Sequence, residues 1–293
     1  MHVPVLSEEA IEWLAIQPEG VYVDATYGRG GHSARILASL GPLGRLLALD
    51  RDPEAERDAR RRFGDDPRFE FVHAPFSQLA QTVDERGLAG QVAGVLMDVG
   101  VSSPQLDDAA RGFSFLQQGP LDMRMDPGAG ESAAEWLARS GEDELADVIY
   151  SFGEERYSRR IARAIVARRA EQPFSTTTDL AAVIAAAVPR HEPRIHPATR
   201  TFQALRIFLN DELGELRAAL TASLDVLAPG GRLVVLSFHS LEDRLVKRFM
   251  RNVSRSEPKR LRIVERLVRP GRQETSSNPR ARSARLRVAE RPA

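Results

Sequence analysis

Hydrophobic and polar positions follow two alternating rhythms through the first hundred residues. Short apolar runs are typical of buried strands, whereas apolar positions that recur every three or four residues are typical of amphipathic helices. Strands that alternate with helices in this way form a mostly parallel sheet covered on both faces. The pattern therefore predicts an α/β fold. The expected strands lie at 21–25, 45–50, 69–73 and 92–98, and the expected helices at 6–15, 32–40, 53–63 and 76–86.

The strand rhythm stops near residue 108, and helical periodicity continues to about 204. We interpret 108–204 as a helical subdomain inserted into one α/β domain, whose two parts are 1–107 and 205–293. Its expected helices lie at 131–139, 142–152, 154–170 and 178–188. The remaining pattern predicts a long helix at 198–227, a tight turn at 229–231, a strand at 232–239 and a helix at 241–251. Two closing strands are expected at 261–268 and 284–289, and the segment 271–282 between them is expected to form a loop over the active face.

A glycine-rich loop follows the first expected strand. The strand ends at Asp24, and Gly28, Gly30 and Gly31 precede the next helix. Glycines let the backbone approach a ligand closely, and the first amides of a helix are available to bind it. The second strand ends at Asp50, 22 residues after Gly28, where a carboxylate can accept both hydroxyls of a ribose. The loop predicts a nucleoside-bearing cofactor, and a glycine turn without a ligand is the weaker alternative.

The spacing of the loop distinguishes between cofactors. A dinucleotide fingerprint needs a third glycine at the position of Ser33, so a nicotinamide-dependent oxidoreductase is disfavoured. Asp24 would repel a pyrophosphate but suits a cationic ligand, and S-adenosylmethionine carries a sulfonium and an ammonium group. The fourth strand ends at Asp98. Because ligands bind at the carboxyl ends of parallel strands, we expect Asp24, Asp50 and Asp98 to converge on one site.

Composition excludes several classes of protein. The 293 residues include no cysteine, which excludes disulfides and thiolate catalysis, and no His-Glu-x-x-His pattern occurs, so we expect no catalytic metal. No apolar run approaches the roughly 20 residues of a membrane span. We expect a cytoplasmic protein without membrane partners.

The zero net charge conceals an asymmetry. Residues 244–293 hold 16 basic and 4 acidic side chains, a net charge of +12, so the rest of the chain carries −12. Such a basic block favours an anionic partner such as nucleic acid, although a solvated arginine-rich surface is the alternative. The expected helix at 154–170 also carries several arginines, which could form an RNA-binding edge or a solvated face. These are Arg156, Arg159, Arg160 and Arg163.

Long motifs along nearly the whole chain resemble those of the bacterial small-subunit ribosomal RNA (cytosine-N4)-methyltransferase family (RsmH or MraW). These motifs are Asp24–Ser33, Asp98–Leu106, Arg111–Phe115, Gly119–Pro127, His196–Ile207, Ser237–Arg244 and Asn278–Ser283.

The resemblance implies a Rossmann-like class I methyltransferase with a seven-stranded, mostly parallel sheet. It implies S-adenosylmethionine as the methyl donor, a cytidine in the decoding region of 16S rRNA as the target, and a substrate-recognition role for the inserted subdomain. The substrate is then 16S rRNA within the small ribosomal subunit. By position, the family's cofactor contacts fall on Gly30, Gly31, His32, Asp50, Phe76, Asp98 and Gln105, to which the loop analysis adds Asp24 and Gly28.

The exocyclic N4 of cytosine is a poor nucleophile, so polar acceptors near it would assist the transfer. Amino-methylating enzymes often carry an acidic or polar residue before Pro-Pro-aromatic, and only Ser103-Pro104 remains of that pattern here. Our catalytic candidates are Asp98, Ser102, Ser103 and His239.

A base within folded RNA must be unstacked to reach such a pocket. Phe113 and Phe115, or Phe238, are candidates to stack on it, and His196 is expected to cap the long helix. Expected phosphate contacts are Arg200, Arg206, Arg280 and Arg282. A non-catalytic RNA-binding or assembly factor, and a methyltransferase acting on another nucleic acid or on protein, remain alternatives. Monomer and homodimer are both open.

Overall fold

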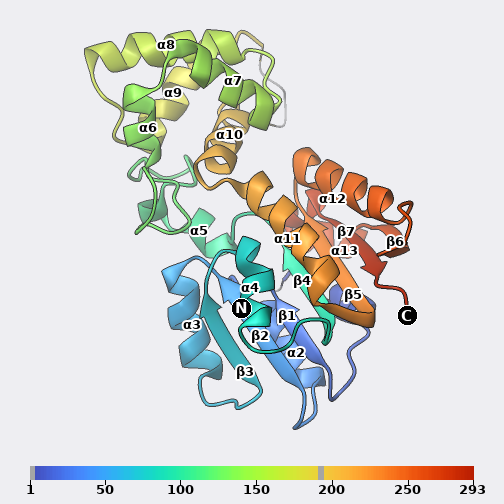
Figure 1. The fold of residues 1–293 in the computed structure, drawn as a ribbon. Helices are drawn as coiled ribbons and strands as arrows, with labels where there is room; N and C mark the ends of the chain where they lie inside the picture. Colours follow the sequence, from blue (N-terminus) through green and yellow to red (C-terminus); the bar gives the residue numbers. More distant parts are fainter. Residues whose placement is uncertain (1–3, 191–194) are drawn as a thin grey trace. The chain divides into compact units, whose positions relative to one another are not determined.

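The computed structural model describes residues 4–190 and 195–293 (Figure 1). The chain forms two compact units. One, the sheet unit, contains the chain up to Gly100 and from Leu213 onward, and the other, the helical unit, is Val101–Glu212. The helical unit therefore extends beyond both ends of the insertion expected at 108–204.

The sheet unit is built on one seven-stranded sheet in the order β3-β2-β1-β4-β5-β7-β6. The first five of these strands run parallel, whereas β7 pairs antiparallel with both β5 and β6. This confirms the predicted seven-stranded, mostly parallel sheet. The strands are β1 (Val21–Asp24), β2 (Arg45–Asp50), β3 (Phe69–His73), β4 (Val92–Asp98), β5 (Leu227–Ser237), β6 (Arg262–Val268) and β7 (Arg285–Glu290).

Alternate residues of each strand pack on opposite faces of the sheet, as the two-residue period of a strand requires. Val23 of β1 and Val95 of β4 belong to a core that includes residues of α4 (Leu79–Asp84), α11 (Glu212–Val226) and α12 (Ser240–Val253). Their neighbours Tyr22 and Leu96 belong to a second core with residues of α1 (Ser7–Leu14) and α2 (Gly31–Ser39). Both faces are buried, which explains the near-continuous apolar runs in the sequence.

Three local expectations in the sheet unit need correction. Residues 229–231, expected as a tight turn, lie within β5. The register with β4 is irregular there, because β4 pairs with Leu227 and next with Arg232. The segment expected as a helix at 76–86 is a short 3₁₀ turn, η1 (Phe76–Gln78), followed by α4. The expected loop at 271–282 contains α13 (Arg272–Ser277) and η3 (Pro279–Ser283). Its Ala281 is buried, and this apolar anchor orders the segment. The helix α3 (Pro53–Phe63) has the predicted bounds.

The helical unit has its own hydrophobic core, centred on the buried Trp136. The long helix expected at 198–227 is broken, because Asp211 adopts a left-handed backbone conformation (φ 46°) between α10 and α11. The helices of this unit are α5 (Ser103–Asp107), η2 (Ala109–Arg111), α6 (Ala133–Arg139), α7 (Glu142–Gly153), α8 (Ser158–Glu171), α9 (Thr177–Ala187) and α10 (Thr199–Leu209).

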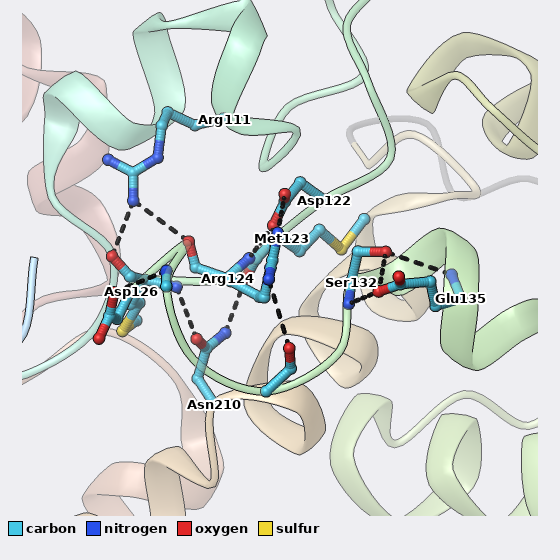
Figure 2. A network of polar contacts seen from close by, with 11 residues as sticks. Arg111, Asp122, Met123, Arg124, Asp126, Ser132, Glu135 and Asn210 are labelled. Carbon is cyan, nitrogen blue, oxygen red and sulfur yellow. Dashed lines mark hydrogen bonds and ion pairs between the residues drawn. The ribbon is translucent and has the colours of Figure 1, made fainter.

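A polar network fixes the loop between η2 and α6 (Figure 2). The Arg111 guanidinium donates to the carbonyls of Arg124 (3.1 Å) and Met125 (2.8 Å). The Asn210 side chain accepts from the Met125 amide at 2.7 Å and donates to the Met123 carbonyl at 2.8 Å. Met123 is fully buried with a positive φ of 66°, so these bonds hold a backbone conformation that costs energy for a side-chain-bearing residue.

Candidate functional site

The glycine loop turns sharply at the carboxyl end of β1. Gly28 and Gly30 both have positive φ, at 56° and 64°. A Cβ at Gly30 would lie 2.5 Å from the Tyr27 hydroxyl oxygen, so only glycine fits there. Tyr27 is buried and donates to Asp58 of α3 at 3.0 Å. The loop is thus held against α3 by its own aromatic residue, and its glycines meet a steric requirement as well as a conformational one.

Asp50, at the end of β2, closes the loop from the neighbouring strand. Its carboxylate accepts from the Gly28 amide at 2.7 Å and from the Asp52 amide at 2.9 Å. Burial raises the pKa of Asp50 to about 6, although these two hydrogen bonds oppose the rise. The carboxylate is therefore tied to the glycine loop and titrates unusually close to neutral pH.

Asp24, expected among the cofactor residues, is fully buried. Its two oxygens accept from the Ser33 hydroxyl at 2.7 Å and from the Thr26 amide at 3.2 Å. Burial raises the pKa of Asp24, and the nearby His32 and Ser33 oppose that rise. Asp24 serves as an internal brace that joins β1 to the start of α2.

The buried His32 lies close to the partly exposed Asp98 beside this brace. His32 Nε2 lies 3.4 Å from Asp98 Oδ2, and the His32 side chain is only 5% exposed. Burial alone would lower the pKa of His32, but the Asp98 and Asp24 carboxylates outweigh it and raise that pKa. Among the described residues, Asp98 Oδ1 and both ring nitrogens of His32 have no hydrogen-bond partner. Buried polar atoms usually have a hydrogen-bond partner in folded proteins, so Asp98 Oδ1 is available to accept a hydrogen bond from a ligand.

The carboxyl ends of β1, β2 and β4 bring the three predicted aspartates together. Asp24 pairs in register with Ala48 and Leu96, and the Asp98 amide donates to the Thr26 hydroxyl at 2.6 Å. Thr26 was not singled out in the sequence, although its place two residues after Asp24 suits an Asx-type turn. Ser33 was noted only as a missing glycine, and its bond to Asp24 is visible only in three dimensions.

The other expected cofactor residues lie in both units. Phe76 opens η1 after β3 and is half-buried against the sheet core. Gln105, Ser102 and Ser103 belong to the helical unit, at the start of α5. Ser102 and Gln105 form a capping box, in which the Gln105 side chain accepts from the Ser102 amide at 2.9 Å. Their side chains thus have a local structural role that the sequence analysis did not assign.

His239, one of the catalytic candidates, lies at the start of a helix. It is the N-cap of α12, and its Nδ1 accepts from the Glu242 amide at 3.5 Å. Its Nε2 lies 3.0 Å from Glu242 Oε1, and the Glu242 side chain is 2% exposed. The Phe238 amide also donates to Glu242, at 2.7 Å. Nδ1 of the imidazole thus caps the first turn of α12, whereas Nε2 has no hydrogen-bond partner among the described residues.

The expected stacking residues differ in accessibility. Phe113 lies in the core of the helical unit, which corrects its candidacy as a stacking surface. Phe115 is half-buried, and its ring centroid lies 4.7 Å from that of the exposed His196. His196 Nδ1 accepts from the Ala198 amide at 3.2 Å, so it does brace the start of α10. Phe238 stays partly exposed in the sheet unit.

The four candidate RNA-binding arginines have unequal surroundings. Arg206 is largely buried and makes a bidentate ion pair with Glu212 at 2.7 and 2.9 Å, so it stabilises the end of α10. Arg200 lies 3.7 Å from Glu155 and is one-third exposed. Arg280 and Arg282 are both exposed on η3, on either side of the buried Ala281.

These observations fit a nucleoside ligand with a cationic end. The ends of β1, β2 and β4 present a glycine turn, a partly exposed Asp50 and an unsatisfied acceptor on Asp98. Negative potential from three aspartates suits a sulfonium and an ammonium group better than a pyrophosphate. No helix in the described part of the chain is long and apolar enough to cross a membrane.

Comparison with known proteins identifies the family of the chain. The model of the MraW methylase family matches residues 1–292. The chain is 58% identical over 304 aligned positions to the ribosomal RNA small subunit methyltransferase H of Thioalkalivibrio sulfidiphilus, covering 99% of this chain and 97% of that protein.

Solved structures align with nearly the whole chain at low sequence identity. The protein PH0851 aligns with a TM-score of 0.51 and 12% identity, covering 99% of this chain and 46% of that one. An rRNA methylase from Streptococcus thermophilus aligns with a TM-score of 0.45 and 13% identity, covering 98% of this chain and 94% of that one.

Proposed function

Because the chain belongs to the MraW methylase family, we propose that it methylates N4 of a cytidine in the decoding region of 16S rRNA within the small ribosomal subunit. The observation that carries this proposal is the 58% identity, across 99% of the chain, to a small-subunit rRNA methyltransferase. The family uses S-adenosylmethionine as its methyl donor. The glycine loop and the aspartates at the strand ends support that choice of cofactor.

The chain's residues can hold such a donor without a dinucleotide fingerprint. Each carboxylate oxygen of Asp50 accepts one hydrogen bond from a backbone amide. The remaining lone pairs can accept hydrogen bonds from the two ribose hydroxyls. Phe76 offers a partly exposed ring next to β3 for the adenine face. Asp24, although buried, adds negative potential that favours a cationic centre.

Asp98 is the residue best suited to assist the acceptor amine. Methyl transfer forms an N–C bond, breaks the sulfonium S–C bond, and requires N4 to lose one proton, which the Asp98 carboxylate would accept and pass to water. A carboxylate that accepts a hydrogen bond from N4 favours a pyramidal nitrogen and stabilises the positive charge that develops there. Asp98 Oδ1 is an unsatisfied acceptor, and His32 at 3.4 Å from Oδ2 restrains the carboxylate. Ser102 and Ser103 remain candidates for contacts with the base.

Methylation of particles that lack the modification tests this proposal. Small ribosomal subunits from a strain without the enzyme are incubated with the protein and S-adenosylmethionine, and their rRNA is digested to nucleosides. Mass spectrometry should detect N4-methylcytidine, and Asp98→Ala should produce much less of it in the same time. Methylation at cytosine C5, or on a ribosomal protein alone, would contradict the proposal. Free 16S rRNA assayed in parallel shows whether the assembled subunit is needed.

A further inference from the structure

The helical unit contains an open pocket apart from the cofactor residues. It is lined by the turn between α7 and α8 and by the segments that flank α9 and α10. We call it the arginine pocket, and all of its residues lie within Val101–Glu212. Its polar and aromatic lining consists of Glu155, Arg156, Tyr157, Arg190, His196 and Arg200.

The pocket carries an excess of positive charge. Glu155, its one carboxylate, is 4% exposed and accepts from the Tyr157 amide at 2.8 Å. It also lies 3.7 Å from Arg200, so this pair cancels one positive charge. Within the described ranges, no carboxylate lies in ion-pair distance of Arg156 or Arg190. Among the described residues, these two guanidinium groups have no acid paired with them, and their positive charge attracts an anion.

This situation differs from that of other arginines in the same unit. Arg163 of α8 pairs with Glu142 at 3.4 Å, and Arg168 of the same helix pairs with Asp179 at 3.3 Å. Arg139 of α6 pairs with Glu131. Arg156 instead lies over the Tyr157 ring, with its guanidinium carbon 4.6 Å from the ring centroid. That contact orients the guanidinium while leaving its in-plane donors available to an anion.

An aromatic surface lies beside these charges. The exposed His196 ring lines the pocket, and Phe115 packs against it with an interplanar angle of 32°. Phe115 also packs on Phe202 of α10, so the His196 ring is connected through Phe115 to the hydrophobic core of the unit. Basic grooves that carry aromatic rings are typical of surfaces that bind single-stranded nucleic acid, where a phosphate meets the charge and a base meets the ring.

We infer that the arginine pocket binds a phosphodiester of a single-stranded rRNA segment between Arg156 and Arg190, with the adjoining base against His196. This inference rests on the proposed function, because it makes the helical unit a second anchor for the same substrate. It also distinguishes Arg156, in the turn before α8, from Arg163 of α8, because Arg156 lines the pocket whereas Arg163 is paired with an acid on the surface.

A pair of double variants tests the pocket in the full-length protein. Arg156→Gln with Arg190→Gln removes the two uncompensated charges, and Arg139→Gln with Arg163→Gln is the matched control. Both remove two exposed arginines from the helical unit, but the control arginines are already paired with acids. Fluorescence anisotropy measures binding of a labelled single-stranded decoding-region RNA, roughly 12 nucleotides long, across a range of salt concentrations.

We expect the pocket variant to bind this RNA on the order of tenfold more weakly at low salt. Its plot of log affinity against log salt should be shallower by about 0.7, as expected for one lost phosphate on a single strand. The control should stay close to wild type, and both variants should keep their melting temperature and their affinity for S-adenosylmethionine. Equal slopes for the two variants would overturn the inference.

Other outcomes separate the pocket from the proposed function. If the pocket variant binds RNA with the wild-type slope but fails to methylate particles, the pocket contacts a protein of the subunit, and the inference is wrong. If wild-type protein methylates no cytidine while the pocket variant still loses RNA binding, the proposed function fails and the pocket stands as an RNA site.

Discussion

The Ser33 hydroxyl donates a 2.7 Å hydrogen bond to Oδ2 of the fully buried Asp24. Ser33 occupies the position where a dinucleotide-binding loop has its third glycine. The side chain that breaks that fingerprint therefore satisfies a buried carboxylate at the centre of the loop. The same residue excludes one class of cofactor site and stabilises the other.

Replacing Ser33 should destabilise the fold. Ser33→Ala leaves a buried carboxylate oxygen without its donor, which costs about 2 kcal/mol, and Ser33→Gly adds roughly 1 kcal/mol for a glycine in a helix. Urea unfolding followed by circular dichroism measures both. Ser39→Ala is the control, because Ser39 is exposed on the same helix and its hydroxyl donates to the Arg35 carbonyl. Equal stability of Ser33→Ala and Ser39→Ala would show that the bond to Asp24 contributes little.

Asp50→Ala should weaken the binding of S-adenosylmethionine by roughly 1.5–3 kcal/mol, which is about 10- to 150-fold, because hydrogen bonds to a charged group are lost. Isothermal titration calorimetry gives the affinity, and the exposed Asp65→Ala serves as the control. Wild-type affinity in the Asp50 variant would remove this carboxylate from the cofactor site.

Cofactor affinity should also depend on pH through Asp50. The protonated carboxyl has fewer acceptor lone pairs than the carboxylate, and the pKa of Asp50 is raised to about 6. Affinity should therefore fall as the pH drops from 7 to 5 through that value and level off above it. Asp50→Asn, which does not titrate, should bind weakly with a flatter profile. A wild-type profile that is level across this range would contradict the assignment of ribose binding to the ionised form.

Asp98→Ala should reduce turnover more than Asp50→Ala does when the donor is saturating. Asp98 is proposed to assist the nucleophile, whereas Asp50 contributes mainly to binding, which saturation restores. Initial rates of methylation on small-subunit particles measure the difference. Near wild-type turnover for Asp98→Ala would exclude it as the acceptor for the N4 amine.

Arg280→Glu with Arg282→Glu should weaken RNA binding and make its salt dependence shallower, because two exposed positive charges become repulsive. Stability should hold, since the buried anchor of η3 is Ala281 rather than either arginine. Affinity for S-adenosylmethionine should be unchanged. A melting temperature that drops while the salt slope stays constant would show that these arginines are structural.

The sequence predicts those features that depend on local pattern. The strands of the sheet follow from apolar runs, and Asp50 and Asp98 were placed because each run ends in an acid. The hydrogen bonds within the site could not be predicted from local pattern. The bond from Ser33 to Asp24, and that from the Asp98 amide to Thr26, depend on how neighbouring strands align.

Tertiary contacts also override local pattern in the helical segments. The apolar periodicity of 198–227 continues through Asn210, yet the helix breaks where the Asn210 side chain bonds Met123 and Met125, more than 80 residues away. Similarly, nothing in the spacing of the arginines distinguishes Arg206, paired with Glu212, from Arg156 in the arginine pocket.

The position of β7 constrains the order in which the sheet can be completed. β6 precedes β7 along the chain but touches the sheet only through it, because β7 lies between β5 and β6. During synthesis, β6 must therefore wait for β7 to emerge from the ribosome, while β5 leaves an unpaired edge. A premature stop before Arg285 would cost the sheet two strands instead of one and leave the hydrogen-bonding groups of β5 open to aggregation.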